Sequence, residues 1–252
     1  MLRLSRFAAA GLHLIASVAV AAAGALLIFR LWYPSPFNLI AGGASLFLLL
    51  VAVDVVLGPA LTFVIARPGK RLREFRGDLA VIVAVQLLAF GYGIYTIAMA
   101  RPVYASFEID RFRVVTAADI ESDQLAKAPA ELRSLPWLGP RMIAAVKPTD
   151  HDELLKSIEL GMAGLDLSMV PANWRSYESQ RDAAWRAARP VSALLARYPE
   201  MQAELASIAK AEGKNAADLR FLPLLSRQAS WVAILAPTDA HIAGYLPVDG
   251  FF

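Results

Sequence analysis

Three long apolar stretches occupy the first hundred residues and constrain the fold more than any other feature. They cover residues 8–29, 39–66 and 79–100, and each is long enough to cross roughly 30 Å of bilayer hydrocarbon as a helix. Lipid satisfies no backbone hydrogen bond, so helices are the expected form. The sequence therefore predicts a three-helix transmembrane domain over residues 1–100. The main polar interruptions are His13, Ser17, Asp54, Thr62 and Gln86.

Charge is distributed unevenly between the two parts of the chain. Residues 1–99 carry eight Lys and Arg against three Asp and Glu, whereas residues 100–252 carry seventeen against nineteen. A nearly neutral C-terminal part is not typical of nucleic-acid binding, so no nucleic-acid partner is expected. The chain contains no cysteine, which excludes disulfides, thiol nucleophiles and thiolate metal sites.

The basic residues near the apolar stretches predict the orientation. Arg3 and Arg6 precede the first stretch, and the loop between the first and second stretches carries a single Arg. The loop before the third stretch carries Arg67, Lys70, Arg71, Arg73 and Arg76. The positive-inside rule then places the N-terminus and this basic loop in the cytoplasm. In a Gram-negative cell, this means an inner-membrane protein whose residues 101–252 lie in the periplasm.

Two alternatives to this topology remain open. The first stretch could be a cleaved signal peptide, because Ala21-Ala22-Ala23 resembles a cleavage site. The basic loop could also bind membrane lipid, in addition to determining orientation. Trp32 and Tyr33 lie where an aromatic belt is expected at the membrane surface.

Asp54 is the most informative residue within the apolar stretches. A carboxylate near the middle of the bilayer costs at least ~2.5–3.5 kcal/mol, so it must face protein or be protonated. Ser17 and Tyr92 fall at similar depth, with Gln86 about one and a half turns away. This spacing predicts a buried hydrogen-bond node joining the three helices. A proton or ion relay and a contact with a polar group of a partner transmembrane helix remain alternatives.

Glycine and proline also mark the second and third stretches. Gly58-Pro59 predicts a kink within the second helix, because proline has no N–H to donate. Small residues allow helices to approach closely, either within the bundle or at a docking face. The glycines concerned are Gly42, Gly43, Gly91 and Gly93.

Residues 101–252 combine strand and helix patterns and predict an α+β domain, so the expected fold class is a three-helix transmembrane bundle plus a C-terminal α+β extracytoplasmic domain. Strands are expected at 103–109 and 112–115, with a turn at Asp110-Arg111, and at 141–147. Asp150 and Glu153 form a capping pair for a helix ending near residue 163. Further helices are expected at 177–188, 190–198, 199–213 and 215–221, followed by a hairpin of strands 230–236 and 242–248.

Catalytic patterns are absent from the sequence. No metal-ligand spacing, Walker loop or dinucleotide fingerprint occurs. Asp239 and His241 with a distant serine could imitate a triad, but no nucleophile-elbow sequence supports one. The prediction is therefore a protein that is not an enzyme, with no catalytic residue, cofactor or metal. The rival classes are a membrane-anchored periplasmic enzyme acting on envelope components and a sensor.

Several motifs closely resemble the TfpX/TfpZ family of type IV pilin accessory proteins. The resemblance is specific over residues 10–115 and looser towards the C-terminus. Its motifs are LWYPSPF (31–37), the pair Gly42-Gly43, VDVVLGPALT (53–62), the loop residue Lys70, DLAVIVAVQ (78–86), YGIYT (92–96) and RPVYASFEIDRF (101–112).

This resemblance implies a non-catalytic inner-membrane protein that assists assembly, stability or surface display of a cognate major type IV pilin. Other inner-membrane pilus assembly components and membrane lipid are further implied partners. A pilin combines an apolar N-terminal helix with a periplasmic head, so a helical bundle plus an external domain could contact both. The motif-matching candidates for structural or partner-contact roles are Asp54, Gly58, Pro59, Gln86, Tyr92, Arg101, Pro102, Asp110 and Arg111.

Overall fold

The computed structural model describes residues 5–67, 69–162 and 164–252, apart from the side chains of Glu153, Lys156, Ile158 and Leu160. Arg3, the capping side chain of Glu153 and the expected helix end at residue 163 therefore lie outside the described residues. The chain forms two compact units, Met1–Ala100 and Arg101–Phe252, which are described separately.

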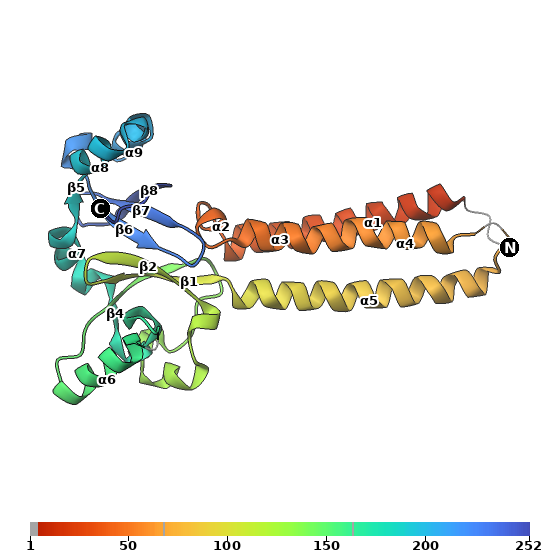
Figure 1. Cartoon of the computed structure of the whole chain (residues 1–252), viewed down its shortest axis with the longest axis horizontal. Coiled ribbons are helices and arrows are strands. Elements are labelled where there is room, and N and C mark those ends of the chain that lie inside the picture. The colour runs from red at the N-terminus through yellow and green to blue at the C-terminus, as the bar shows by residue number, and fades with distance from the viewer. Residues whose placement is uncertain (1–4, 68, 163) are drawn as a thin grey trace. The chain divides into compact units, whose positions relative to one another are not determined.

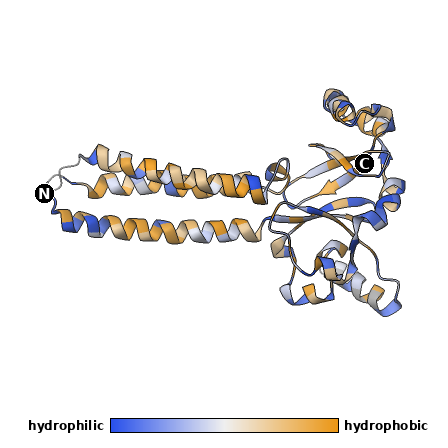
Figure 2. Cartoon of the chain, turned by 180° about the vertical axis from the view of Figure 1, so that it is seen from behind, coloured by the Kyte–Doolittle hydropathy of each residue, from blue (hydrophilic) through white to orange (hydrophobic). Residues whose placement is uncertain are grey.

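The first unit consists of apolar helices (Figure 2). Helix α1 (Arg6–Leu27) continues through a π-helical turn, η1 (Ile28–Trp32), and a short helix α2 (Phe37–Ile40) follows. Helix α3 (Gly43–Ala52), π-helical turn η2 (Val53–Leu57) and helix α4 (Gly58–Ile65) form one continuous helix, and α5 (Leu72–Met99) completes the unit. Among the described residues, three helices are long and apolar enough to cross a membrane, as the sequence predicts: Arg6–Trp32, Gly43–Ile65 and Leu72–Met99.

Two helix boundaries differ from the expected ones. The second long helix begins at Gly43 rather than at residue 39, because Gly42 adopts a left-handed conformation (φ 73°) that ends α2. The third begins at Leu72, seven residues before the apolar stretch. Charged residues there continue the helix beyond its apolar part, and Asp78 pairs with Lys70. Hydropathy thus located the apolar part of the helix, from residue 79, but not the residue at which the helix begins.

Helix α4 packs against both α1 and α5 (Figure 1). At the end of the bundle that contains η1, Trp32 and Tyr33 are buried among the helices rather than exposed as an aromatic belt would be. The Tyr33 hydroxyl donates to the Ile97 carbonyl at 3.0 Å. A Cβ on Gly93 would lie 2.4 Å from Leu50 Cδ1, so this glycine allows α3 and α5 to approach closely. These two contacts help to hold this end of the bundle together.

A mixed eight-stranded sheet is the centre of the second unit, which confirms the predicted α+β class. The strand order is β4-β3-β1-β2-β6-β7-β8, with β5 also pairing with β6. Strands β1 and β3 are parallel, as are β2 and β6, and the other pairs are antiparallel. The strands are β1 (Pro102–Glu108), β2 (Arg111–Thr116), β3 (Arg141–Ala145), β4 (Trp174–Ser176), β5 (Arg189–Pro190), β6 (Arg220–Leu225), β7 (Ser230–Leu235) and β8 (Ile242–Leu246).

Helices and 3₁₀ turns cover the sheet. The α-helices are α6 (His151–Met162), α7 (Arg181–Ala187), α8 (Val191–Arg197) and α9 (Gln202–Ala211). The 3₁₀ turns are η3 (Ala117–Asp119), η4 (Ser122–Lys127), η5 (Ala130–Leu132), η6 (Leu167–Met169), η7 (Pro171–Asn173), η8 (Tyr177–Gln180), η9 (Pro199–Met201) and η10 (Ala216–Asp218).

Two hydrophobic clusters stabilise the sheet. Leu194 of α8 and Leu205 of α9 pack on Phe221 of β6 and Ile234 of β7, in the part of the domain where Figure 1 labels α8 and α9. The second cluster lies over β1 to β3, where Trp174 is fully buried. Both clusters bury large side chains, which is the main source of stability for a domain of this size.

Several elements of this domain differ from the sequence prediction, which did not include the short strands β4 and β5. The helix expected at 215–221 is limited to the 3₁₀ turn η10, with Asn215 at its N-cap position, and β6 begins at Arg220, where the apolar run is a buried central strand. Periodicity alone does not distinguish such a strand from a buried helix. The first hairpin turns at Ile109-Asp110, one residue earlier than expected, and Ile109 has φ 55°. A left-handed conformation is rare for a β-branched residue, which explains why the sequence did not indicate it.

Candidate functional site: a polar groove in the helical bundle

The centre of the site is a break in the backbone hydrogen bonding of the second long helix. In a π-helical turn each carbonyl pairs with the N–H five residues later. For Asp54, in η2, that residue is Pro59, which has no N–H. The Asp54 carbonyl therefore needs a donor from outside its own helix, and π-helical turns of this kind are frequent at functional sites.

Gln86 of α5 supplies that donor. Its Nε2 donates to the Asp54 carbonyl oxygen at 3.1 Å. Because a carbonyl can only accept, the amide nitrogen must face it, and Oε1 points elsewhere. A Cβ on Gly58 would lie 2.2 Å from Nε2, so only glycine leaves room for this bond. Asp54, Gly58, Pro59 and Gln86 thus form one structural unit joining η2 and α4 to α5.

The Asp54 carboxyl group is not the centre of the node that the sequence predicts. Its side chain is only 7% exposed, yet Oδ1 has no hydrogen-bond partner among the described residues. Gln86 Oε1 is equally buried and also has no partner in the described part of the chain. The bond to Gln86 uses the backbone instead. Two buried acceptors are left over, and each carries a desolvation cost of about 1–3 kcal/mol.

A second polar contact joins α1 to α4. His13 Nδ1 and Thr62 Oγ1 are 2.5 Å apart. The sequence shows both residues as polar interruptions of apolar stretches, but nothing in their spacing indicated that they would meet. The sequence signal for such a contact is a polar residue within an apolar stretch, because such residues usually face protein rather than lipid.

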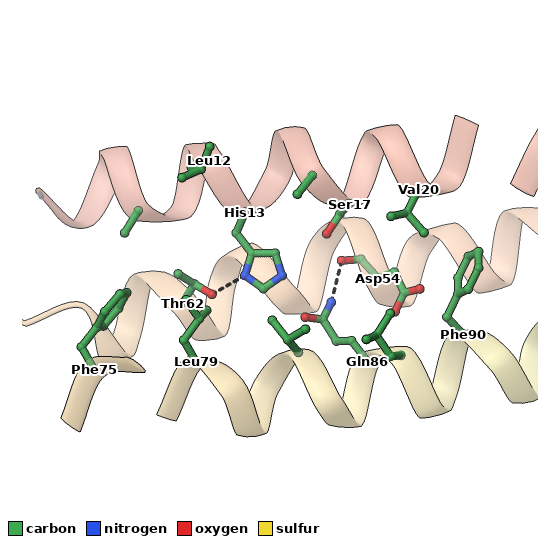
Figure 3. A pocket seen from close by; sticks show the side chains of 14 residues that line it. Leu12, His13, Ser17, Val20, Asp54, Thr62, Phe75, Leu79, Gln86 and Phe90 are labelled. Carbon is green, nitrogen blue, oxygen red and sulfur yellow. Dashed lines mark hydrogen bonds between the residues drawn. The ribbon is translucent and has the colours of Figure 1, made fainter. Parts of the chain in front are cut away.

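A cavity of about 360 Å³ lies along these contacts (Figure 3). It is bordered by α1 and α5, with η2 and α4 between them, and its lining is largely apolar. Leu12 and Leu87 line it and are 63% and 59% exposed, so the cavity opens to the outside of the bundle as a groove. Asp54 stands at the midpoint of Gly43–Ile65, and His13, Ser17, Thr62 and Gln86 also contribute polar atoms to the lining.

Tyr92 does not join this site. Its side chain is 73% exposed on α5 and does not line the groove. The sequence prediction placed Tyr92 nearer to Asp54 in depth than Gln86, but Gln86 is the residue that contacts Asp54. The direction in which a side chain points depends on how α5 is rotated. Its carbonyl accepts a hydrogen bond from Thr96 Oγ1 at 3.0 Å, within α5 itself.

The remaining candidates lie in the second unit. Arg101 is 8% exposed, with its guanidinium 5.0 Å from the centre of the Trp137 ring. Its carbonyl accepts from Ala117 N at 3.0 Å, and Pro102 opens β1 as a buried residue. These contacts are internal to the domain and connect the start of the sheet to the loops that cover it.

Asp110 and Arg111 are adjacent at the first hairpin. Arg111 Nε lies 2.9 Å from Asp110 Oδ1, and its guanidinium lies 5.3 Å from the centre of the Phe251 ring. The pair therefore joins the hairpin to the C-terminal residues. Neither residue is part of the lining of the groove.

His241 belongs to the triad-like combination with Asp239 that the sequence offers. Its Nδ1 contacts Asp239 Oδ1, and its Nε2 lies 3.0 Å from Glu212 Oε2. The hydrogen bond with Asp239 raises the pKa of His241 and lowers the pKa of Asp239. A carboxylate thus occupies the position that a serine would take in a triad. Among the described residues, no group of three or more His, Asp or Glu is placed to hold a metal ion.

Comparisons with known proteins place this architecture in a family. Residues 3–42 match the family described as "Fimbrial assembly protein FimB". The chain is 36% identical to "Fimbrial assembly protein, serogroup I" of Dichelobacter nodosus over 96% of its length and 94% of that protein, and 35% identical to the serogroup E1 protein over the same shares. The serogroups C1 and C2 protein is 46% identical over 47% of this chain and 90% of that protein. No solved structure matches. The chain therefore belongs to the family of fimbrial assembly proteins.

Proposed function

We propose that this protein is a non-catalytic accessory factor that assists assembly, stability or surface display of a fimbrial subunit at the inner membrane. The observation that carries the proposal is kinship over 96% of the chain with fimbrial assembly proteins. Kinship of that extent covers both units, so the bundle and the domain belong to one function. The more specific assignment to the TfpX/TfpZ type of pilin accessory protein, with a cognate major type IV pilin as partner, rests on the motifs at residues 31–112.

The proposed topology places the N-terminus and the basic loop in the cytoplasm and Arg101–Phe252 in the periplasm. It is supported by the basic residues from Arg67 to Arg76, which flank α4 and α5. A subunit that spans the membrane would then meet the bundle with its helix and the domain with its external part. Other assembly components of the inner membrane are further proposed partners.

A non-catalytic role is supported by the surroundings of His241. Both of its ring nitrogens face carboxylates, which leaves neither nitrogen available to activate a nucleophile. No specific observation favours the rival role of an enzyme acting on envelope components.

The proposal is tested in a fimbriated host that lacks the gene. The deletion should abolish or strongly reduce surface fimbriae, and the full-length chain should restore them. A tagged full-length chain solubilised in mild detergent should retain the fimbrial subunit. A version lacking residues 101–252 tests whether the bundle alone suffices. Unchanged fimbriation after deletion, or no subunit retained by the full-length chain, would refute the proposal.

His241→Gln provides the test between accessory factor and enzyme. An accessory factor should restore fimbriation with this substitution as long as the protein accumulates normally. Loss of fimbriae at normal protein level would instead favour an enzyme centred on His241.

A further inference from the structure

We propose that the groove between α1 and α5 binds a single apolar transmembrane helix of the fimbrial subunit, and that this helix places a hydrogen-bond donor against Asp54 and Gln86. This inference rests on the proposed function and names the surface and the chemistry through which the partner is held. The experiments below separate its failure from failure of the proposed function.

The shape of the bundle is the first reason. Helix α4 packs against both α1 and α5, and the 360 Å³ cavity lies along these three helices. Leu12 on one wall and Leu87 on the other are exposed and apolar. A fourth helix in this position would bury both walls, as in the packing of a four-helix bundle. Small and apolar residues dominate the rest of the lining, which suits close helix packing in lipid.

The unpaired acceptors are the second reason. Asp54 Oδ1 and Gln86 Oε1 are buried without a hydrogen-bond partner among the described residues, near the midpoints of their helices. Unsatisfied polar groups at this depth are costly, because hydrocarbon cannot replace water as a partner. An occupant that carries a hydroxyl, amide or ammonium group at the same depth would satisfy them. The groove thus selects for a donor as well as for apolar surface.

This requirement distinguishes a helix from the other possible occupants. A lipid acyl chain fills apolar space but has no donor, and lipid head groups lie at the membrane surface rather than at the depth of Asp54. A second copy of this chain would have to insert a helix that its own bundle already holds, since α5 packs on α3 and α4. A partner with one free apolar helix meets no such obstacle.

Position-specific crosslinking tests the inference directly. A photoreactive benzoyl-phenylalanine is placed at Leu87, which lines the groove, or at Leu88, which is 76% exposed on the same helix and outside it. Leu12 and Ile15 form the equivalent pair on α1. In membranes that contain a tagged fimbrial subunit, we expect crosslinks to the subunit at positions 87 and 12 in at least tenfold excess over positions 88 and 15.

A blocking substitution gives a second measure. Leu87→Trp fills the groove and should reduce the subunit retained by the full-length chain at least fivefold, whereas Leu88→Trp should retain it as the wild type does. Asp54→Leu removes the unpaired acceptor but leaves the Gln86 bond, which goes to the backbone. Interhelical hydrogen bonds of typical strength predict about three- to twentyfold weaker retention for this variant. Should the Asp54 variant fail to accumulate, the Leu87 and Leu88 pair decides alone.

The two levels of the proposal fail differently. If the wild-type chain retains no subunit, the proposed function is wrong and the inference falls with it. If the subunit is retained but crosslinks equally at positions 87 and 88, or is unaffected by Leu87→Trp, only the groove is excluded. Crosslinks at position 87 to a second copy of the chain or to lipid, without the subunit, also overturn the inference.

Discussion

Gly58→Ala tests the contact that organises the groove. An added Cβ would lie 2.2 Å from Gln86 Nε2 and 2.7 Å from Gln86 Cδ, well inside van der Waals contact. Gln86 is flexible, so its amide should swing away, and the Asp54 carbonyl would then lose its 3.1 Å hydrogen bond. Interhelical hydrogen bonds in membranes contribute about 0.6 kcal/mol on average and up to about 1.7 kcal/mol. The loss should lie in this range, because Pro59 leaves the carbonyl no partner at the next π-helical position.

Alanine also stabilises a helix relative to glycine, by up to about 1 kcal/mol in water, and this gain would mask the loss. Gly91→Ala is the matched control, because a Cβ at position 91 meets nothing within 4 Å. We expect Gly58→Ala to be about 0.6–1.7 kcal/mol less stable than Gly91→Ala. In a Gln86→Ala background this difference should vanish, since the clash and the bond are then both absent.

The measurement is reversible unfolding in mixed micelles titrated with sodium dodecyl sulfate. The chain has no native cysteine, so dyes can be attached at Ser5→Cys and Gly77→Cys. These positions lie near the ends of α1 and α5, where Ala9 and Phe75 belong to one buried cluster. Energy transfer between the dyes reports the integrity of the bundle. If Gly58→Ala is as stable as Gly91→Ala, or if the difference persists without Gln86, the assignment of the hydrogen bond is refuted.

Three further perturbations have defined outcomes. His241→Gln should lower the free energy of local unfolding of the β7–β8 turn by about 1 kcal/mol at pH 6 and by little at pH 9. The figure at pH 6 allows for solvent screening, because the His241–Asp239 pair is partly exposed. The hydrogen bond with Asp239 raises the pKa of His241, so this stabilisation is complete below about pH 6.5 and is lost as pH rises through the folded pKa. It fades again in acid as Asp239 protonates. Hydrogen exchange of residues 236–242 at both pH values checks the prediction, and equal exchange in the two proteins would refute it. Tyr33→Phe removes the buried bond to the Ile97 carbonyl and should cost about 1 kcal/mol in the detergent titration, whereas an unchanged midpoint would show that the bond contributes nothing. Ile109→Asn relieves the backbone strain of a β-branched residue at φ 55° and should stabilise the domain by about 1 kcal/mol in thermal unfolding of the full-length chain. A lower melting temperature would contradict this strain.

Properties that depend on neighbours in the chain could be predicted from the sequence. The length and apolar character of the helices containing His13, Asp54 and Gln86 required no tertiary information, because membrane thickness and hydropathy decide them. The α+β class of the second unit followed in the same way from local periodicity. The run after Arg220 was the exception, since a buried strand and a buried helix share one apolar pattern.

Properties that depend on how helices are rotated and paired required the tertiary structure. The motifs singled out Asp54, Gly58 and Gln86, which the structure brings together, but did not indicate that the Asp54 carbonyl, rather than its carboxyl group, would bond to Gln86. Tyr92, which was predicted to lie at the depth of Asp54, is 73% exposed and does not line the groove. Sequence spacing determines position along a helix, whereas the direction of a side chain relative to another helix depends on packing between segments distant in the chain. The groove, which is built from three such segments, is therefore a property of the tertiary structure alone.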